Sequence, residues 1–362
     1  MSNVVKKKRI FYFDALRALA ILSVIMIHAF NTSIEGHHAF YSGYPSISWF
    51  LSTFFGNYTR IGVDLFLMLS GALSLGRDWD IRTFLGKRIP RIVLPFLFWG
   101  FVLSVGMVAF SYAYPDSFTT ITTFNLSSFL DYLLHSYLAD NTGFTPYWFF
   151  WMILGTYLIM PIYNKWLQHC DMKEVEYFLA IWLIVTFATS FDIFFPVKLS
   201  YFTGAIGVVV LGYYLRHSER KIYKNPFFIV ALLVLSFLLL TAASFEFTVP
   251  SEFHKLNRYH IIIIMEVIGV FLLFKNFSSF FPKARLSERW IVKKPVSLLA
   301  KYSYGLYLIH RVFIIILYYL LGITNHVYSV VIMLFILATL VSTFVMGIFD
   351  HIPYVNRVIG SK

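Results

Sequence analysis

Charged residues and cysteines are scarce in this chain. Lysine, arginine, aspartate and glutamate make up 13% of its 362 residues, about half the fraction found in an ordinary soluble domain, so a soluble globular fold is excluded. The single cysteine, Cys170, excludes an internal disulfide framework and a metal centre built from several thiolates of one chain. The nucleophile elbow, the Walker loop, the dinucleotide fingerprint and the zinc-protease helix are absent. We therefore expect neither redox chemistry, nor a bound metal, nor a permanently bound cofactor.

Most of the sequence consists of long apolar runs. The chain is 59% hydrophobic with a mean hydropathy of +0.71, which indicates an all-α integral membrane protein, a polytopic helical bundle. Apolar runs bounded by charge, proline or glycine predict ten transmembrane helices, centred on residues 10–30, 55–76, 91–112, 146–165, 177–195, 200–215, 226–245, 259–275, 302–321 and 328–349. No tandem repeat or appended soluble segment is visible, so one membrane domain is expected over residues 1–362.

The net charge of +12 follows the predicted loops. Basic residues gather at the N-terminus and in alternate loops, around residues 77–88, 165–173, 216–224 and 275–301. Lysine and arginine collect in cytoplasmic loops, so both termini are predicted to be cytoplasmic and no nucleic-acid partner is expected. The first apolar run is too long for a secretory signal and no small-residue cleavage site follows it, so we expect it to remain as the first helix.

The first predicted helix carries three ionisable residues, Asp14, Arg17 and His28. Charge at hydrocarbon depth is costly. The eleven residues from Arg17 to His28 bring both side chains to nearly the same helix face, roughly 16 Å apart along the axis, and Asp14 lies within reach of the Arg17 guanidinium. The pattern favours a helix that lines a polar cavity in the membrane. The alternative is that Arg17 reaches a lipid headgroup and His28 lies at the opposite interface, both in structural roles.

Two further carboxylates lie within apolar helices. Asp64 is in the second span and Glu266 in the eighth. A carboxylate at membrane depth has to pair with another group or face water. Asp64 therefore either lines a catalytic pocket or fixes helix packing through a hydrogen bond, and Glu266 has no evident partner in the sequence.

Arg88 and Arg91 lie three residues apart at the predicted cytoplasmic edge of the third span. Guanidinium groups in this arrangement are suited to gripping a phosphate-bearing ligand that enters from the cytosol. The positive-inside bias is the competing explanation for Arg88, whereas Arg91 lies deeper in the apolar run.

Aromatic residues and a histidine mark the fourth and ninth spans. Trp148 stands in an aromatic cluster that fits either an interfacial belt or a surface for stacking a sugar or a donor. Tyr304 and His310 lie in the ninth span, where a satisfied structural histidine is the simpler reading of His310.

Two outer segments contain histidine. His37 and His38 are adjacent in the first, without a clear third metal ligand, so a solvated loop is expected there. Asp131 and His135 lie at i and i+4 in the second, within an apolar patch that predicts an interfacial re-entrant helix.

Short motifs in this chain together resemble those of the membrane acyltransferase 3 family. They are Asp14-Ala-Leu-Arg17 followed by His28, Gly62-Val-Asp64-Leu-Phe66 ahead of Leu69-Ser70-Gly71, Arg88-x-x-Arg91 with Pro95, Trp148-Phe149, and the run from Tyr302 to His310. Leu67 and Ala72 stand where the family more often has phenylalanine. The resemblance covers nearly the full length. Members of the family move acyl groups, most often acetyl, onto sugars of surface glycans.

The resemblance implies a role for each candidate residue. His28 is the expected general base because imidazole titrates near neutral pH, with Arg17 and Asp14 beside it in the catalytic site. Arg88 and Arg91 are expected to handle acyl-coenzyme A, the acyl donor. We place a supporting pocket around Asp64, Trp148, Glu266, Tyr304 and His310.

The expected enzyme is an acetyl-coenzyme A-dependent O-acyltransferase in the cell membrane of a prokaryote. Its acceptor is a hydroxyl of a cell-surface or lipid-linked glycan. Many relatives carry a fused extracytoplasmic domain that this chain lacks, so either the membrane domain acts directly or a separate partner completes the transfer. The competing hypothesis is a transporter or flippase for lipid-linked glycans, since ten spans with internal charge also suit transport. Transporters often have internally repeated halves, and no such repeat is visible here.

Overall fold

The computed structural model describes residues 10–35, 54–114, 126–138, 147–193, 204–246, 256–322 and 327–361. Every regular element within these residues is helical, which confirms the all-α class. The α-helices are α1 (Phe11–Glu35), α3 (Ile61–Ser74), α4 (Ile81–Ala113), α5 (Leu126–Leu138), α6 (Trp148–His169), α7 (Met172–Ser190), α8 (Ala205–His217), α9 (Pro226–Glu246), α10 (Ile261–Phe280), α11 (Trp290–Leu320) and α12 (Val327–Asp350). The 3₁₀ helices are η4 (Lys221–Lys224) and η5 (Val355–Arg357).

Six of the described helices are long and apolar enough to cross a membrane, namely α1, α4, α9, α10, α11 and α12. These helices indicate a multi-pass membrane protein. Each of the ten predicted spans overlaps a described helix, but α3 and α8 have only 14 and 13 residues, fewer than the roughly 20 that cross the hydrocarbon core. The count of ten spans therefore stays a prediction.

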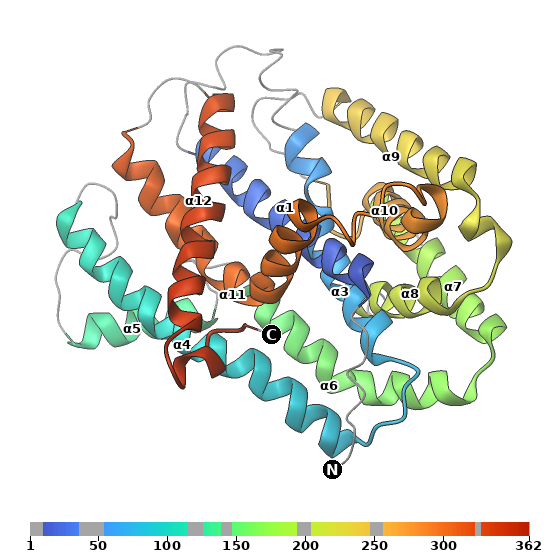
Figure 1. Cartoon of the computed structure of the whole chain (residues 1–362), viewed down its shortest axis with the longest axis horizontal. Helices are drawn as coiled ribbons and strands as arrows, with labels where there is room; N and C mark the ends of the chain where they lie inside the picture. Colours follow the sequence, from blue (N-terminus) through green and yellow to red (C-terminus); the bar gives the residue numbers. More distant parts are fainter. Residues whose placement is uncertain are drawn as a thin grey trace.

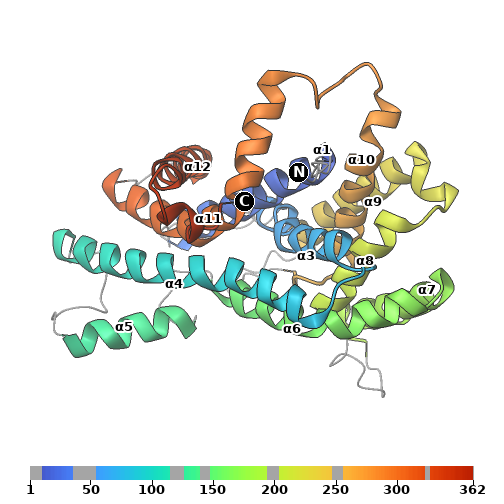
Figure 2. The same cartoon turned by 60° about the horizontal axis from the view of Figure 1, so that its bottom comes forward.

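Several helix boundaries differ from the predicted ones. The helix α4 begins at Ile81, ten residues earlier than expected, because the Asp80 carboxylate accepts a hydrogen bond from the Thr83 backbone N–H at 3.2 Å and caps the helix. The predicted loop over residues 275–301 shortens to residues 281–289, since α10 continues to Phe280 and α11 begins at Trp290. Figure 2 shows this turn standing away from the other helices.

The first helix lies at the centre of the bundle. It packs against α3, α10, α11 and α12 (Figure 1). The helices α4, α5 and α6 form a layer beneath it in Figure 2, with α4 in contact with both α5 and α6. This arrangement buries Asp14 of α1 and leaves Arg17 and His28 partly exposed.

Glycines allow α3 to pack very closely against its neighbours. A Cβ at Gly62 would lie 2.6 Å from the Ala20 carbonyl oxygen of α1, and one at Gly71 would overlap the Val209 carbonyl oxygen of α8. Any side chain at these positions would push the helices apart. The position of α3 between α1 and α8 thus depends on these glycines.

The segment predicted to form an interfacial helix is helical, as α5, and its interfacial position stays a prediction. Within it the His135 Nε2 lies 3.4 Å from the Asp131 carboxylate, and both side chains are exposed. The adjacent histidines His37 and His38 lie outside the described residues.

Candidate active site

The first predicted pair is present on α1. The Asp14 side chain is buried, and the Arg17 Nη1 donates a hydrogen bond of 3.0 Å to its Oδ1. This ion pair neutralises the carboxylate and fixes the first part of the guanidinium side chain. Arg17 also lines two adjoining cavities, so this end of the predicted polar face borders open space, whereas His28 is absent from both described linings.

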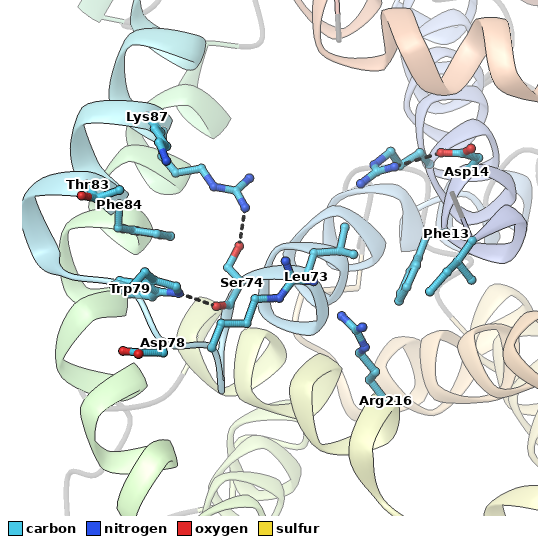
Figure 3. A pocket seen from close by; sticks show the side chains of 14 residues that line it. Phe13, Asp14, Leu73, Ser74, Asp78, Trp79, Thr83, Phe84, Lys87 and Arg216 are labelled. Carbon is cyan, nitrogen blue, oxygen red and sulfur yellow. Dashed lines mark hydrogen bonds and ion pairs between the residues drawn. The ribbon is translucent and has the colours of Figure 1, made fainter. Parts of the chain in front are cut away.

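The larger cavity has a volume of about 1060 Å³, slightly above the usual range for ligand sites. It lies between the start of α1, the end of α3, the first turns of α4 and the end of α8 (Figure 3). We name it the basic cavity because its lining includes five basic side chains, Arg17, Arg77, Lys87, Arg88 and Arg216. The acidic side chains in the same lining are Asp14 and Asp78. The excess of positive charge suits a polyanionic ligand.

The Arg88 guanidinium is held in place by α3 and by aromatic rings. Its Nη2 donates a hydrogen bond of 2.8 Å to the Ser74 Oγ, and the Ser74 carbonyl accepts one of 2.8 Å from the Trp79 indole (Figure 3). The rings of Phe84 and Tyr157 lie 5.8 and 6.0 Å from the guanidinium. A guanidinium fixed in this way loses little side-chain entropy when it binds an anion.

Arg216 enters the basic cavity from α8. It donates a hydrogen bond to the Ala72 carbonyl, and its guanidinium lies 5.2 Å from the ring centroid of Phe13. Burial, together with the positive charges of Arg216 and Arg88, lowers the pKa of Arg77 from its usual value. Like charges held this close favour a bound anion, which would relieve their repulsion.

The second cavity has a volume of about 660 Å³ and adjoins the first. The two linings share Arg17, Leu73, Arg77 and Arg88. We name it the inner cavity. Its remaining lining combines polar and aromatic side chains and includes Phe66, Arg91, Phe149, Tyr157, Tyr304, Tyr307, Asn356 and Arg357. The predicted arginine pair is therefore divided, since Arg88 lines both cavities and Arg91 lines only the inner one.

His28 lies close to the second predicted histidine. The ring centroids of His28 on α1 and His310 on α11 are 5.1 Å apart, and His310 is fully buried. The Nδ1 of His310 is 2.9 Å from the Leu306 carbonyl oxygen. The rings of His310 and Tyr307 are 6.1 Å apart, and Tyr307 lines the inner cavity. The described lining of either cavity stops short of both histidines.

Tyr304 is the one predicted supporting residue in the described lining of the inner cavity, and its hydroxyl donates to the Ile92 carbonyl at 2.8 Å. Trp148 lies outside both linings, where the Arg258 guanidinium covers its ring at 3.5 Å. Asp64 and Glu266 are buried, and neither carboxylate has a hydrogen-bond partner among the described residues. The structure thus gathers part of the predicted pocket around one space.

Several lining residues have no signal in local sequence spacing. Arg77 and Arg216 fit the positive-inside pattern and nothing in their spacing marks them as ligand contacts. Asn356 and Arg357 lie in η5, a few residues after α12, and reach the inner cavity only through the fold. All of these are brought together by packing between segments far apart in the chain.

A family model described as an acyltransferase domain, acyltransferase 3, matches residues 10–351. The chain belongs to the acyltransferase 3 family. The suspected resemblance is thereby confirmed over nearly the whole chain. Comparisons of this acyltransferase with curated proteins and with solved structures return no match. Every residue in the described lining of the basic cavity, from Ile10 to Arg216, lies within the matched residues, so the family domain forms this cavity.

Proposed function

We propose that this acyltransferase moves an acetyl group from cytosolic acetyl-coenzyme A to a hydroxyl of a cell-surface or lipid-linked glycan, with His28 as general base. The observation that carries the proposal is the pair of adjoining cavities with Arg17 in both linings. The basic cavity matches the phosphates of coenzyme A in charge. The inner cavity extends from there to Tyr307, whose ring is 6.1 Å from that of His310, the neighbour of His28.

The reaction removes a proton from the acceptor hydroxyl and supplies one to the coenzyme A thiolate that leaves. His28 takes the proton of the acceptor hydroxyl while the oxygen attacks the thioester carbonyl. The carbon–sulfur bond then breaks, and the coenzyme A thiolate leaves and is protonated. Arg17 supports the donor or stabilises the developing negative charge on the carbonyl oxygen. The described lining of the inner cavity reaches Tyr307, so a thioester has to move beyond this lining to meet His28.

The location of the chain ends supports the proposed orientation. Ile10 lines the basic cavity and Ser361 lines the inner cavity, and these cavities share four residues. The two ends of the described chain therefore border adjoining cavities, which favours placing both on one side of the membrane. We place that side in the cytoplasm of a prokaryotic cell, where the donor is made, and the acceptor on the opposite side of the cell membrane. A separate extracytoplasmic protein is the alternative route by which the acetyl group reaches the glycan.

The test uses the full chain purified in detergent. Acetyl-coenzyme A should raise its melting temperature, which a simple transporter of lipid-linked glycans would not show. His28→Ala should retain this stabilisation and lose acetyl transfer, by a factor of about 100 to 10,000. His351→Ala is the matched control, because this exposed histidine lies outside both cavities. Full transfer activity in His28→Ala would show that His28 is not the general base. If acetyl-coenzyme A does not raise the melting temperature of the wild type, the proposal that it is the donor fails.

A further inference from the structure

The end of the chain is built into the wall of the inner cavity. We name residues 355–361 the C-terminal segment. Four of its residues, Asn356, Arg357, Gly360 and Ser361, line the inner cavity. All four follow residue 351, where the family match ends, so the match assigns them no role. The segment contributes the only part of the described lining that lies beyond the matched residues.

The C-terminal segment is docked by specific contacts. The Trp99 indole N–H on α4 donates a hydrogen bond of 3.1 Å to the Ile359 carbonyl, and both side chains are almost completely buried. Gly360 has φ +82°, and a Cβ there would lie 3.0 Å from the Tyr304 ring and 3.1 Å from the Gly305 nitrogen. Only glycine adopts this conformation readily in so little space. The segment is thus fixed between α4 and α11.

Charge in the inner cavity is of one sign. Its lining contains five arginines, Arg17, Arg77, Arg88, Arg91 and Arg357. No aspartate or glutamate belongs to the described lining. Four of these arginines come from α1, from the turn after α3 and from α4, and Arg357 lines the same cavity from the C-terminal segment, where its guanidinium lies 5.6 Å from the ring centroid of Tyr354. An anion in this cavity would lie among arginines from both parts of the chain.

We infer that the C-terminal segment forms part of the donor site, with Arg357 binding the phosphate-bearing end of acyl-coenzyme A opposite Arg88 and Arg91. This inference rests on the proposed function. Asn356 and Ser361 add neutral hydrogen-bonding groups on the same side. Trp99 is a positioning residue, because it acts on the donor only by holding Ile359.

The test measures the dissociation constant of coenzyme A for the full chain in detergent by calorimetric titration. Arg357→Gln should raise it about 10-fold, as expected for one charge-assisted hydrogen bond. Arg357→Lys should lie between the wild type and Arg357→Gln, because it keeps the charge without the fork of donors. Arg289→Gln is the matched control, since Arg289 is exposed and outside both cavities and the change in net charge is the same. Trp99→Phe should also weaken binding.

Arg88→Gln separates failure of this inference from failure of the proposed function. If Arg88→Gln weakens coenzyme A binding and Arg357→Gln does not, the donor site stands without the C-terminal segment. If the wild type does not bind coenzyme A, the proposed function fails as well. Equal losses in Arg357→Gln and Arg289→Gln would reduce the effect to net charge, and tighter binding in Trp99→Phe would show that the segment obstructs the site. The inference about the C-terminal segment is overturned by an unchanged dissociation constant in Arg357→Gln, by equal losses in Arg357→Gln and Arg289→Gln, or by tighter binding in Trp99→Phe.

Discussion

Replacing Arg88 with glutamine tests whether the basic cavity binds the donor phosphates. Arg88 lines both cavities, and its guanidinium is fixed by a hydrogen bond of 2.8 Å to Ser74 Oγ. A hydrogen bond between charged groups contributes about 1.5–3 kcal/mol, which corresponds to a factor of about 10 to 100 in affinity. Four other basic side chains remain in the basic cavity. Arg88→Gln should therefore raise the dissociation constant of acetyl-coenzyme A by that factor without abolishing binding. Calorimetric titration of the purified full chain measures it.

Two controls separate ligand contact from other effects of this substitution. Ser74→Ala removes the same internal hydrogen bond but keeps the guanidinium, so it should change the dissociation constant less than Arg88→Gln. Arg82→Gln removes one positive charge from the same helix at an exposed position outside both cavities, and it should leave binding nearly unchanged. The reasoning is refuted if Arg88→Gln stays within twofold of the wild type, or if Arg82→Gln weakens binding equally.

Two further predictions concern stability. Gly71→Ala should destabilise the chain by about 1–3 kcal/mol through overpacking against the Val209 carbonyl. Gly155→Ala, inside α6 with open space around its Cβ, should be slightly stabilising in the same thermal unfolding assay, because alanine favours a helix more than glycine does. Hydrogen bonds from Arg220, and then from Tyr214, lower the pKa of Glu176 to about 2, so its contribution to stability is present above the unfolded pKa and lost as the pH falls toward 2. Glu176→Gln should therefore lower the melting temperature at pH 7 by about 1–3 °C, and its difference from the wild type should shrink below about pH 4.5; a difference independent of pH would contradict this.

The sequence predicts helices well where apolar runs end at charged residues, as for α9 and α12. It fails at the start of α4, because Arg82, Lys87 and Arg88 make the first turns of this helix look like a basic loop. A helix outside the hydrocarbon core does not need an apolar sequence, and the Asp80 cap determines where α4 begins. The same reasoning explains why α11 begins at Trp290, ahead of the apolar run.

Local spacing also limits what the sequence reveals about the site. The Asp14–Arg17 ion pair follows from a three-residue gap on one helix and is present. The contact between His28 and His310 joins two helices separated by most of the chain, and no spacing rule predicts it. The placement of Arg216 beside Phe13 and of Arg357 in the inner cavity likewise depends on how α8 and the C-terminal segment pack.

The arginines that line the cavities and the aromatic side chains around Tyr307 lie in different parts of the site, and this gives a physical reason for the proposed path of the acetyl group. Moving phosphates into the bilayer would be costly, and the arginines of the basic cavity and of the adjoining part of the inner cavity allow them to stay at the end of the bundle where α1 begins. The arm of coenzyme A that carries the thioester is uncharged, so it can enter the part of the inner cavity lined by Phe66, Phe149 and Tyr307 without that cost. Arg17 and His28 are roughly 16 Å apart along α1, and an extended arm would carry the acetyl group from one toward the other. Charge thus remains where water is available, and only the reacting group has to reach the histidines.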